Sequence, residues 1–193
     1  MLSFVFDTGG SVLAKIPEQI LEGLEEDYLL SFFAYICLEI YDTCSTEFHM
    51  TGFGVKRWPT EVYPEFSMLL EELPALVAWL QSGSEEAFVL ELCEQGMTID
   101  IHFIQSGGVV TAECHDIEFF DSTSGRTVVL NRPHPEYLNE SMQRAVLEEQ
   151  LLECARGFLR VLGSHVKIPY VHFLLEKWLE PLDEGTIASL GFA

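Results

Sequence analysis

Basic residues are scarce in this sequence and missing from a long part of it. The chain has 193 residues, with 10 Lys and Arg against 31 Asp and Glu, a formal net charge of −21. Residues 1–125 hold 22 acids and three bases, a net −19, and no Lys or Arg occurs from Trp58 to Gly125. So one-sided a field repels nucleic acid and anionic membranes and attracts cations. An acidic proteome background is the alternative explanation of the composition.

Long apolar runs, a secretory signal and paired cysteines are also missing. The most apolar stretch, Tyr28 to Tyr41, contains Glu39 and is shorter than the roughly twenty residues of a membrane span. The start, Met1 to Asp7, has no basic region and reaches an acid at once, unlike a signal peptide. The five cysteines form no Cys-x-x-Cys pair, so we expect all five to be free thiols and the protein to be cytoplasmic. We expect no bound metal or cofactor.

Catalytic motifs are absent as well. The sequence contains no nucleophile elbow, Walker A loop, His-Glu-x-x-His or Gly-x-Gly-x-x-Gly,. Asp7, Thr8 and Gly9 match the Asp-Thr-Gly of aspartic proteases, but Gly10 follows them and no second copy exists. Because that chemistry needs two aspartates, an ordinary turn is the better interpretation. The sequence therefore predicts a protein that is not an enzyme.

The apolar content predicts a well-packed core. Hydrophobic residues make up 48% of the chain and aromatic residues 12%, with 14 Phe among them. A chain of this length can bury most of its apolar surface in one core and is short for two domains. We therefore expect residues 1–193 to form a single domain. The expected strands cluster in the middle of the sequence, and the expected helices come before and after them. This order indicates an α+β fold, in which an antiparallel sheet packs on one face against helices from the N- and C-terminal parts.

The middle of the chain carries the clearest pattern, an antiparallel meander over about 87–130. Residues 88–93, 98–103 and 109–115 alternate apolar with polar, and turn residues lie at Gln95-Gly96 and Gly107-Gly108,. The first turn pairs residue 92 with 99, and the second pairs 106 with 109. Both registers place the same apolar set on one face. That set is Phe88, Leu90, Leu92, Ile99, Ile101, Phe103, Val110, Ala112 and Cys114.

The flanking segments indicate further elements. Turn residues 8–11 predict a hairpin from Phe4 to Ile16. Periodicity does not separate a helix from a buried strand over residues 28–41, and a helix is favoured for most of that run. Residues 43–60 are interpreted as a connection, followed by a helix from Pro64 that Pro74 kinks or restarts. Three shorter elements are also expected: a helix from Pro17, a hairpin of 117–120 with 126–130, and a helical segment over 171–179. A long helix is expected over 136–162. Its apolar stripe consists of Leu138, Met142, Val146, Leu147, Leu151, Cys154, Phe158 and Leu162.

The other face of the meander gathers the candidate site. The registers place Glu91 opposite Asp100 and Asp100 opposite His115, and in the next row His102 lies opposite Glu113. A one-sided sheet has a solvated face in any case, but directly opposed acids are destabilising. We therefore interpret this face as a partner-binding surface. A carboxylate–histidine active site, or a metal site built on the two histidines, is the alternative, although no zinc-type spacing occurs.

Two aromatic residues near the only basic cluster of the acidic region complete the predicted binding residues. Lys56, Arg57 and Trp58 follow Phe53 closely. The cluster is too small for nucleic acid, and its cations are expected to pair with nearby acids. Aromatic side chains dominate the centres of protein interfaces, so Phe53 and Trp58 are predicted as anchors.

The segment Phe66 to Pro74 with Trp79-Leu80, followed by the meander with Glu94-Gln95-Gly96, resembles bacterial immunity proteins, the cognate inhibitors of polymorphic secreted toxins. The resemblance covers about residues 50–120. It implies a monomeric protein that binds a toxin's catalytic domain, usually by blocking its active site. Such domains are often basic, which would suit the charge of this chain.

Two other classes remain open. An acidic secretion chaperone or adaptor would also be α+β, but it would dimerise and bind an extended segment. A hydrolase would use Glu91, Asp100, His102 and His115.

The cysteine pattern predicts that titration of the denatured, non-reduced protein detects five thiols,. A value well below five would contradict the assignment to a reducing compartment.

Overall fold

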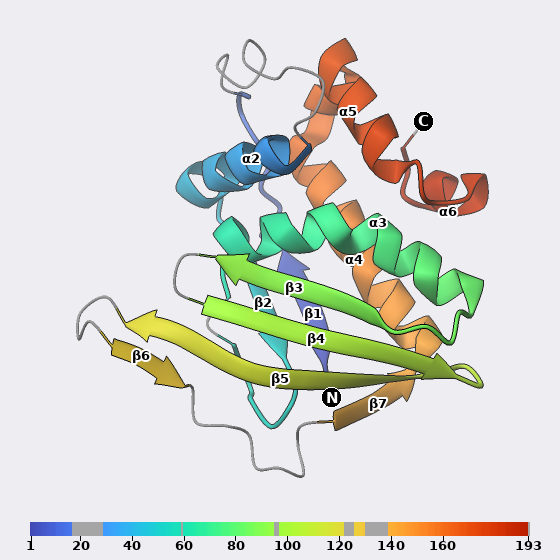
Figure 1. The fold of residues 1–193 in the computed structure, drawn as a ribbon. Helices are drawn as coiled ribbons and strands as arrows, with labels where there is room; N and C mark the ends of the chain where they lie inside the picture. The colour runs from blue at the N-terminus through green and yellow to red at the C-terminus, as the bar shows by residue number, and fades with distance from the viewer. Residues whose placement is uncertain (17–28, 59, 95–96, 122–125, 130–138, 193) are drawn as a thin grey trace.

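A five-stranded antiparallel sheet is the largest feature of the computed structural model (Figure 1). The structure describes residues 1–16, 29–58, 60–94, 97–121, 126–129 and 139–192. The sheet has the order β3-β4-β5-β6, and β7 also pairs with β5. Its strands are β3 (Phe88–Glu94), β4 (Met97–Ser106), β5 (Val109–Asp121), β6 (Arg126–Val129) and β7 (Asn139–Gln143).

The predicted meander registers are confirmed. Leu92 pairs with Ile99 across the first hairpin, and Ser106 pairs with Val109 across the second. The predicted inward set is buried, except that Phe88 is half-buried beside Trp79. The pairing of β5 with β6 also matches the third predicted hairpin, whose turn and last residue lie outside the described residues. The α+β fold class is therefore correct.

Helices from both halves of the chain pack against this sheet, as expected. They are α3 (Ser67–Ser82), which contacts β3, and α4 (Arg144–Leu162), which contacts β7. Pro74 lies inside α3 without ending it, and Gly83 closes the helix in the left-handed conformation,. The other helices are α2 (Leu29–Thr43), α5 (Pro169–Leu179) and α6 (Glu184–Ser189), and the short helical turns are η1 (Val62–Phe66) and η3 (Gly163–Lys167). In Figure 1, α2 and α5 lie above α3.

Two of these helices match the expectations directly. The apolar run to Tyr41 is helical in α2, and α5 covers the expected segment 171–179. The helix expected to begin at Pro17 falls on residues outside those described.

The predicted hairpin from Phe4 to Ile16 is wrong. Strand β1 (Ser3–Asp7) pairs instead with β2 (Glu47–Thr51), in a second, two-stranded sheet. The turn itself is present, because the Ser11 amide donates to the Thr8 carbonyl. The chain after it bonds to the end of α4, where the Leu13 amide donates to the Val161 carbonyl at 2.7 Å. A distant partner therefore satisfies backbone groups that a hairpin would have paired.

The interpretation of residues 43–60 as a mere connection is also wrong, because β2 lies within it. The alternation was visible in the sequence: Phe48 and Met50 are buried, and the residues between and around them are not. Five residues of strand were too short to stand out beside the glycines that follow.

Of the helix expected over 136–162, the part from Arg144 onward is helical in the described residues. Residues Asn139–Gln143 form β7 instead, in which Met142 pairs with Val110 and is buried. Residues 136–138, with Leu138 of the expected stripe, lie outside the described residues. The Arg144 amide donates to the Gly108 carbonyl, which extends the ladder to the start of the helix. Pairing with β5 outweighs the helical pattern, and Val146, expected in the apolar stripe, is 41% exposed. The later stripe positions Leu147, Leu151, Cys154, Phe158 and Leu162 are buried as expected.

An aromatic cluster joins the two-stranded sheet to the helices. Phe66 of η1 stacks on Phe6 of β1, with ring centroids 4.1 Å apart, and lies 5.0 Å from Phe48 of β2. Phe158 of α4 lies 6.5 Å from Phe66. Phe33 of α2 and Trp178 of α5 pack around Phe158 at 5.7 and 6.0 Å. Six elements therefore meet in one contiguous apolar core.

The described cysteine side chains are Cys37, Cys44, Cys114 and Cys154, and all four are thiols. Burial raises the pKa of Cys37 far above its ordinary value and raises that of Cys154 to about 12. These two thiols therefore stay protonated and unreactive until the protein unfolds.

Helix α4 covers the free edge of β1. The Phe4 amide donates to Oε1 of Gln150 at 3.4 Å, and Phe6 lies against Gly157. A Cβ atom at position 157 would come within 2.9 Å of the Phe6 ring, which is itself stacked on Phe66. The absence of a side chain at Gly157 is thus what lets the helix approach the strand.

We predict that Gly157→Ala lowers the free energy of unfolding by about 1 kcal/mol, measured by urea denaturation. Overpacking of about 1–3 kcal/mol outweighs the gain of about 1 kcal/mol in helix propensity. The reverse exchange at exposed Ala145 of the same helix, Ala145→Gly, isolates the propensity effect. Stabilisation by Gly157→Ala would contradict the close contact.

Candidate protein-binding face

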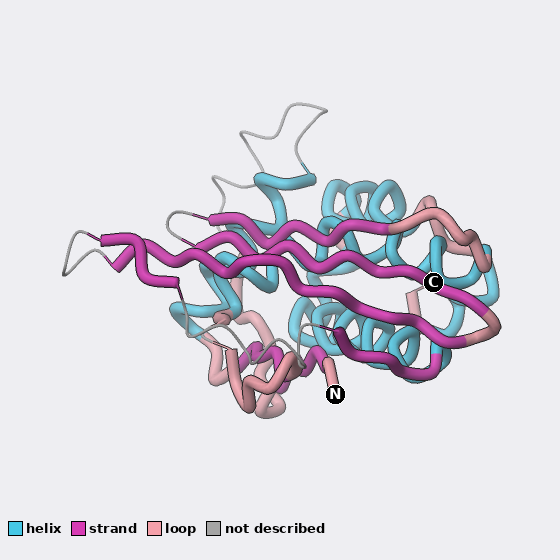
Figure 2. Tube along the Cα trace, turned by 60° about the horizontal axis from the view of Figure 1, so that its bottom comes forward, coloured by secondary structure: helices cyan, strands magenta, loops and turns pink. Residues whose placement is uncertain are grey.

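One face of the large sheet carries no helix among the described residues. In Figure 2 the helices lie on one side of the strands, and the other side is open. Side chains such as Leu90, Ile101 and Ala112 point to the helical side and are fully buried. The alternate residues of the same strands therefore form a surface that no described helix covers, called the open face below,.

The predicted polar residues are brought together on this uncovered surface. Glu91 pairs with Asp100, which pairs with His115, and His102 pairs with Glu113 in the adjacent row. We call Val89 and these five residues the acidic face. The strand register of the predicted rows is thus correct. The β4–β5 register shifts only beyond these rows, between Thr98 and Asp100.

The residues of the acidic face differ in exposure. Glu91 is exposed, whereas the side chains of Asp100, His102 and Glu113 are half-buried. The side chain of His115 lies outside the described ones. Glu91 and Asp100 lie directly across the β3–β4 pair, where cross-strand Cβ atoms are about 5 Å apart. The free protein therefore holds like charges at close range.

The acidic face also presents apolar side chains. Val89, which the predicted register places opposite His102, is 38% exposed. Ile104, two residues beyond His102 and not among the predicted binding residues, is 44% exposed. Ile104 pairs with Thr111, and the Thr111 and Ser141 hydroxyls are 3.1 Å apart across β5 and β7. Alternation along β4 was enough to find Ile104. The contribution of β7 was hidden by its resemblance to the start of a helix.

Phe53 and Trp58, predicted as aromatic anchors, are not surface residues. They are 0% and 1% exposed, and their rings pack edge to face at 6.1 Å. Phe53 lies at a positive φ of 53°, and its amide donates to Oε1 of Glu140 in β7 at 2.8 Å. The indole of Trp58 donates to the Gly52 carbonyl. Both rings therefore fill the core between the two sheets, and the prediction that they contact a partner is wrong.

Of the two neighbouring basic residues, Arg57 pairs with an acid as expected, whereas Lys56 makes no ion pair with a described residue. Arg57 pairs with Glu47 at 3.1 Å, and both side chains are well exposed. The pair joins a loop to β2 and carries little stability at such exposure.

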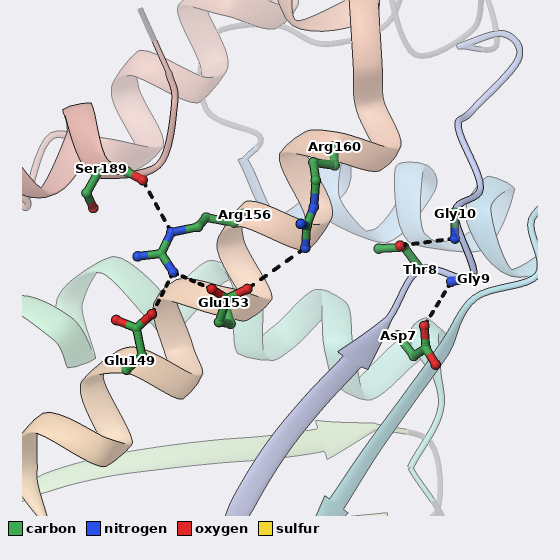
Figure 3. Close-up of polar contacts among 9 residues, drawn as sticks. All are labelled: Asp7, Thr8, Gly9, Gly10, Glu149, Glu153, Arg156, Arg160 and Ser189. Carbon is green, nitrogen blue, oxygen red and sulfur yellow. Dashed lines mark hydrogen bonds and ion pairs between the residues drawn. The ribbon is translucent and has the colours of Figure 1, made fainter.

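The Asp-Thr-Gly segment is a turn held by its own side chains (Figure 3). Oδ1 of Asp7 accepts from the Gly9 amide at 2.9 Å, and the Thr8 hydroxyl accepts from the Gly10 amide at 3.3 Å. These local bonds are typical of Asx and Ser/Thr turns. They account for the Asp7 carboxylate without any catalytic role.

The two described clefts lie away from the acidic face. Two clefts, of about 880 and 490 Å³, are lined by residues of α4, α5, β1 and the C-terminal segment, none of which belongs to the acidic face. Among the described residues, no three His, Cys, Asp or Glu side chains are grouped closely enough to hold a metal ion. Neither of these two clefts therefore places a small substrate beside Glu91, Asp100 or Glu113.

Comparison with known proteins found no match to this chain among protein families, curated proteins or solved structures. None of the described helices is long and apolar enough to cross a membrane.

The opposed acids predict that Glu91→Lys stabilises the free protein by about 0.5 kcal/mol, because a cross-strand repulsion becomes an attraction to Asp100. Glu85→Lys is the matched control: it makes the same change of charge at an exposed position before β3. Urea denaturation at low salt should separate the two variants, and salt near 1 M should remove the difference. Equal stability of both variants at low salt would contradict the close pairing.

Proposed function

We propose that this protein is an immunity protein that neutralises a secreted toxin by binding the toxin's catalytic domain and blocking its active site. The acidic face is the proposed contact surface, and the proposed partner surface is basic. The observation that carries this proposal is the placement of three carboxylates, Glu91, Asp100 and Glu113, in two adjacent rows of an uncovered sheet. Binding, and not catalysis, is the proposed activity.

The stability cost of the acidic face supports a cationic partner. Directly opposed acids destabilise a sheet by about 0.2–1 kcal/mol per pair. A Lys or Arg from a partner between Glu91 and Asp100 would replace that repulsion by charge-assisted hydrogen bonds. Opposed carboxylates on an open strand face therefore suit contact with a basic partner.

The overall field favours fast capture. With −19 on residues 1–125, approach of a basic domain is steered over a range of about one Debye length, ~8 Å at physiological salt. Such steering acts mainly on the association rate. We therefore expect salt to slow association strongly and to change dissociation little.

The apolar border residues supply the other requirement of a tight interface. Interfaces combine a desolvated apolar centre with a polar rim. Val89 and Ile104 lie on neighbouring rows beside His102 and are both exposed. They take the place of Phe53 and Trp58 as the proposed hydrophobic contacts.

Co-expression with the C-terminal domain encoded by the neighbouring gene tests the proposal. Cells should survive when the wild-type protein is present and die when it carries Glu91→Lys, Asp100→Lys and Glu113→Lys together. The triple reversal should fold normally, as judged by circular dichroism, because all three positions lie on the open face.

A second triple reversal controls for net charge. Asp42→Lys, Glu180→Lys and Glu184→Lys change the charge equally at exposed positions away from the sheet, so this variant should still protect. Death of cells that express the wild-type protein contradicts the immunity function. Survival with the first triple variant contradicts only the choice of surface.

A further inference from the structure

The larger cleft, of about 880 Å³, lies on the helical side of the molecule, away from the acidic face. It forms where the end of α4 meets η3, the start of α5 and the residues that follow α6. This volume is within the range of about 300–1,000 Å³ that is usual for small-molecule sites.

The charged residues that line this cleft are all basic, in contrast to the acidic chain as a whole. Arg156, Arg160 and Lys167 line it, together with His172, and no Asp or Glu does. The whole chain has only 10 Lys and Arg, so three of the ten line one cleft. The sequence already concentrates basic residues in this part of the chain, because residues 126–193 hold seven bases against nine acids.

Arg156 belongs to the frame of the cleft (Figure 3). Its Nη1 lies 2.6 Å from Glu153 and 2.8 Å from Glu149, and its Nε donates to the Ser189 carbonyl at 3.2 Å. The hydrogen bonds to Glu149 and Glu153 raise the pKa of the guanidinium above its ordinary value. Arg156 thereby ties α4 to the C-terminal segment, and its charge is largely compensated.

The other two cations are more available. The Arg160 side chain is 67% exposed, and its nearest carboxylate oxygen, of Glu153, is 3.9 Å away. Lys167 is exposed, and within the described part of the chain it makes no ion pair. Both therefore keep donors for an anionic group that enters the cleft.

The remaining wall is apolar and partly aromatic. The Phe192 ring stacks on the His172 ring, with centroids 4.8 Å apart and an angle of 20° between the planes. Leu159, Val166 and Leu190 lie beside this pair in the lining. Such a wall favours a flat or aliphatic body that makes few hydrogen bonds.

We propose that this cleft binds a small amphipathic anion, a molecule with an aromatic or aliphatic body and one acidic group. The acidic group lies between Arg160 and Lys167, and the body packs on Phe192 and the neighbouring apolar side chains. The basic lining is the reason for choosing an anionic ligand. The net charge of the protein is −21 and repels anions, so only a local cluster of cations can attract one. The proposal is independent of the toxin-binding function, since the sheet and α4 separate the two surfaces.

Two fluorescent probes with the same ring system test this proposal. 8-Anilino-1-naphthalenesulfonate carries an anionic group, and N-phenyl-1-naphthylamine lacks it. Titrations of the full-length protein should give one site per chain, with the sulfonate binding more tightly by at least about fivefold, because each charged contact adds to the same apolar burial. Binding of the sulfonate should weaken with salt.

Variants separate the two halves of the site. The pair Arg160→Ala with Lys167→Ala should weaken sulfonate binding by at least about fivefold and leave the neutral probe unchanged. Phe192→Ala should weaken both probes, because it removes the aromatic wall. The charge-matched control is Lys56→Ala with Lys177→Ala, two lysines that do not line the cleft, and it should change neither affinity.

Two results would overturn the proposal. One is equal affinity for the charged and neutral probes. The other is sulfonate binding that the Arg160 and Lys167 changes leave intact, which would place the probe elsewhere. Near-ultraviolet circular dichroism confirms that each variant keeps its packed core, so that a loss of affinity reports on the cleft.

Discussion

The contact between Phe66 and Phe158 holds the architecture together. Through the rings around them, two strands and four helical elements from distant parts of the chain share one core. The indole of Trp178 adds a polar tie, since it donates to the Leu70 carbonyl of α3 at 2.6 Å. Helix α4 is fixed in this way. It contacts β7 of the large sheet as well as β1, and its last turns line the basic cleft.

This arrangement explains why the large sheet is one-sided. Helices α3 and α4 cover one face, and the remaining helices pack behind them around the aromatic cluster. The opposite face is then left to polar residues, and here they are mostly acids. A sheet held firmly from behind can tolerate like charges in front, because each unfavourable pair costs about 1 kcal/mol or less against a large buried core.

The distribution of charge gives the molecule two different surfaces. Carboxylates gather on the open sheet, whereas a cluster of cations lies around the end of α4. Segregation of this kind creates opposite local fields within one small protein. It is the physical basis of both proposals, a basic protein on the acidic face and a small anion in the cleft.

The sequence by itself determined the meander, its register and the content of its two faces. Two short turns and strict alternation are local signals, and a slip of one residue would have exposed Leu90 and Ile101. Local signals also favoured a helix at α2 and placed the apolar stripe from Leu147 onward. For the same reason, Glu91, Asp100 and His102 could be placed on one surface without a structure.

Only the tertiary structure decided the long-range pairings. The residues of β1 pair with residues of β2 that lie 40 to 48 positions further along the chain, and no local pattern encodes that distance. The segment before α4 has an apolar spacing compatible with a helix, and it became β7 because the edge of β5 was available to it. Phe53 and Trp58 look like surface anchors beside Lys56 and Arg57, but the bend at Gly52 turns both rings inward. The basic cleft, too, needed the fold, because Arg160, Lys167 and Phe192 come from three separate elements. Backbone pairing and burial depend on which segments meet in space, and that is settled by the whole core at once.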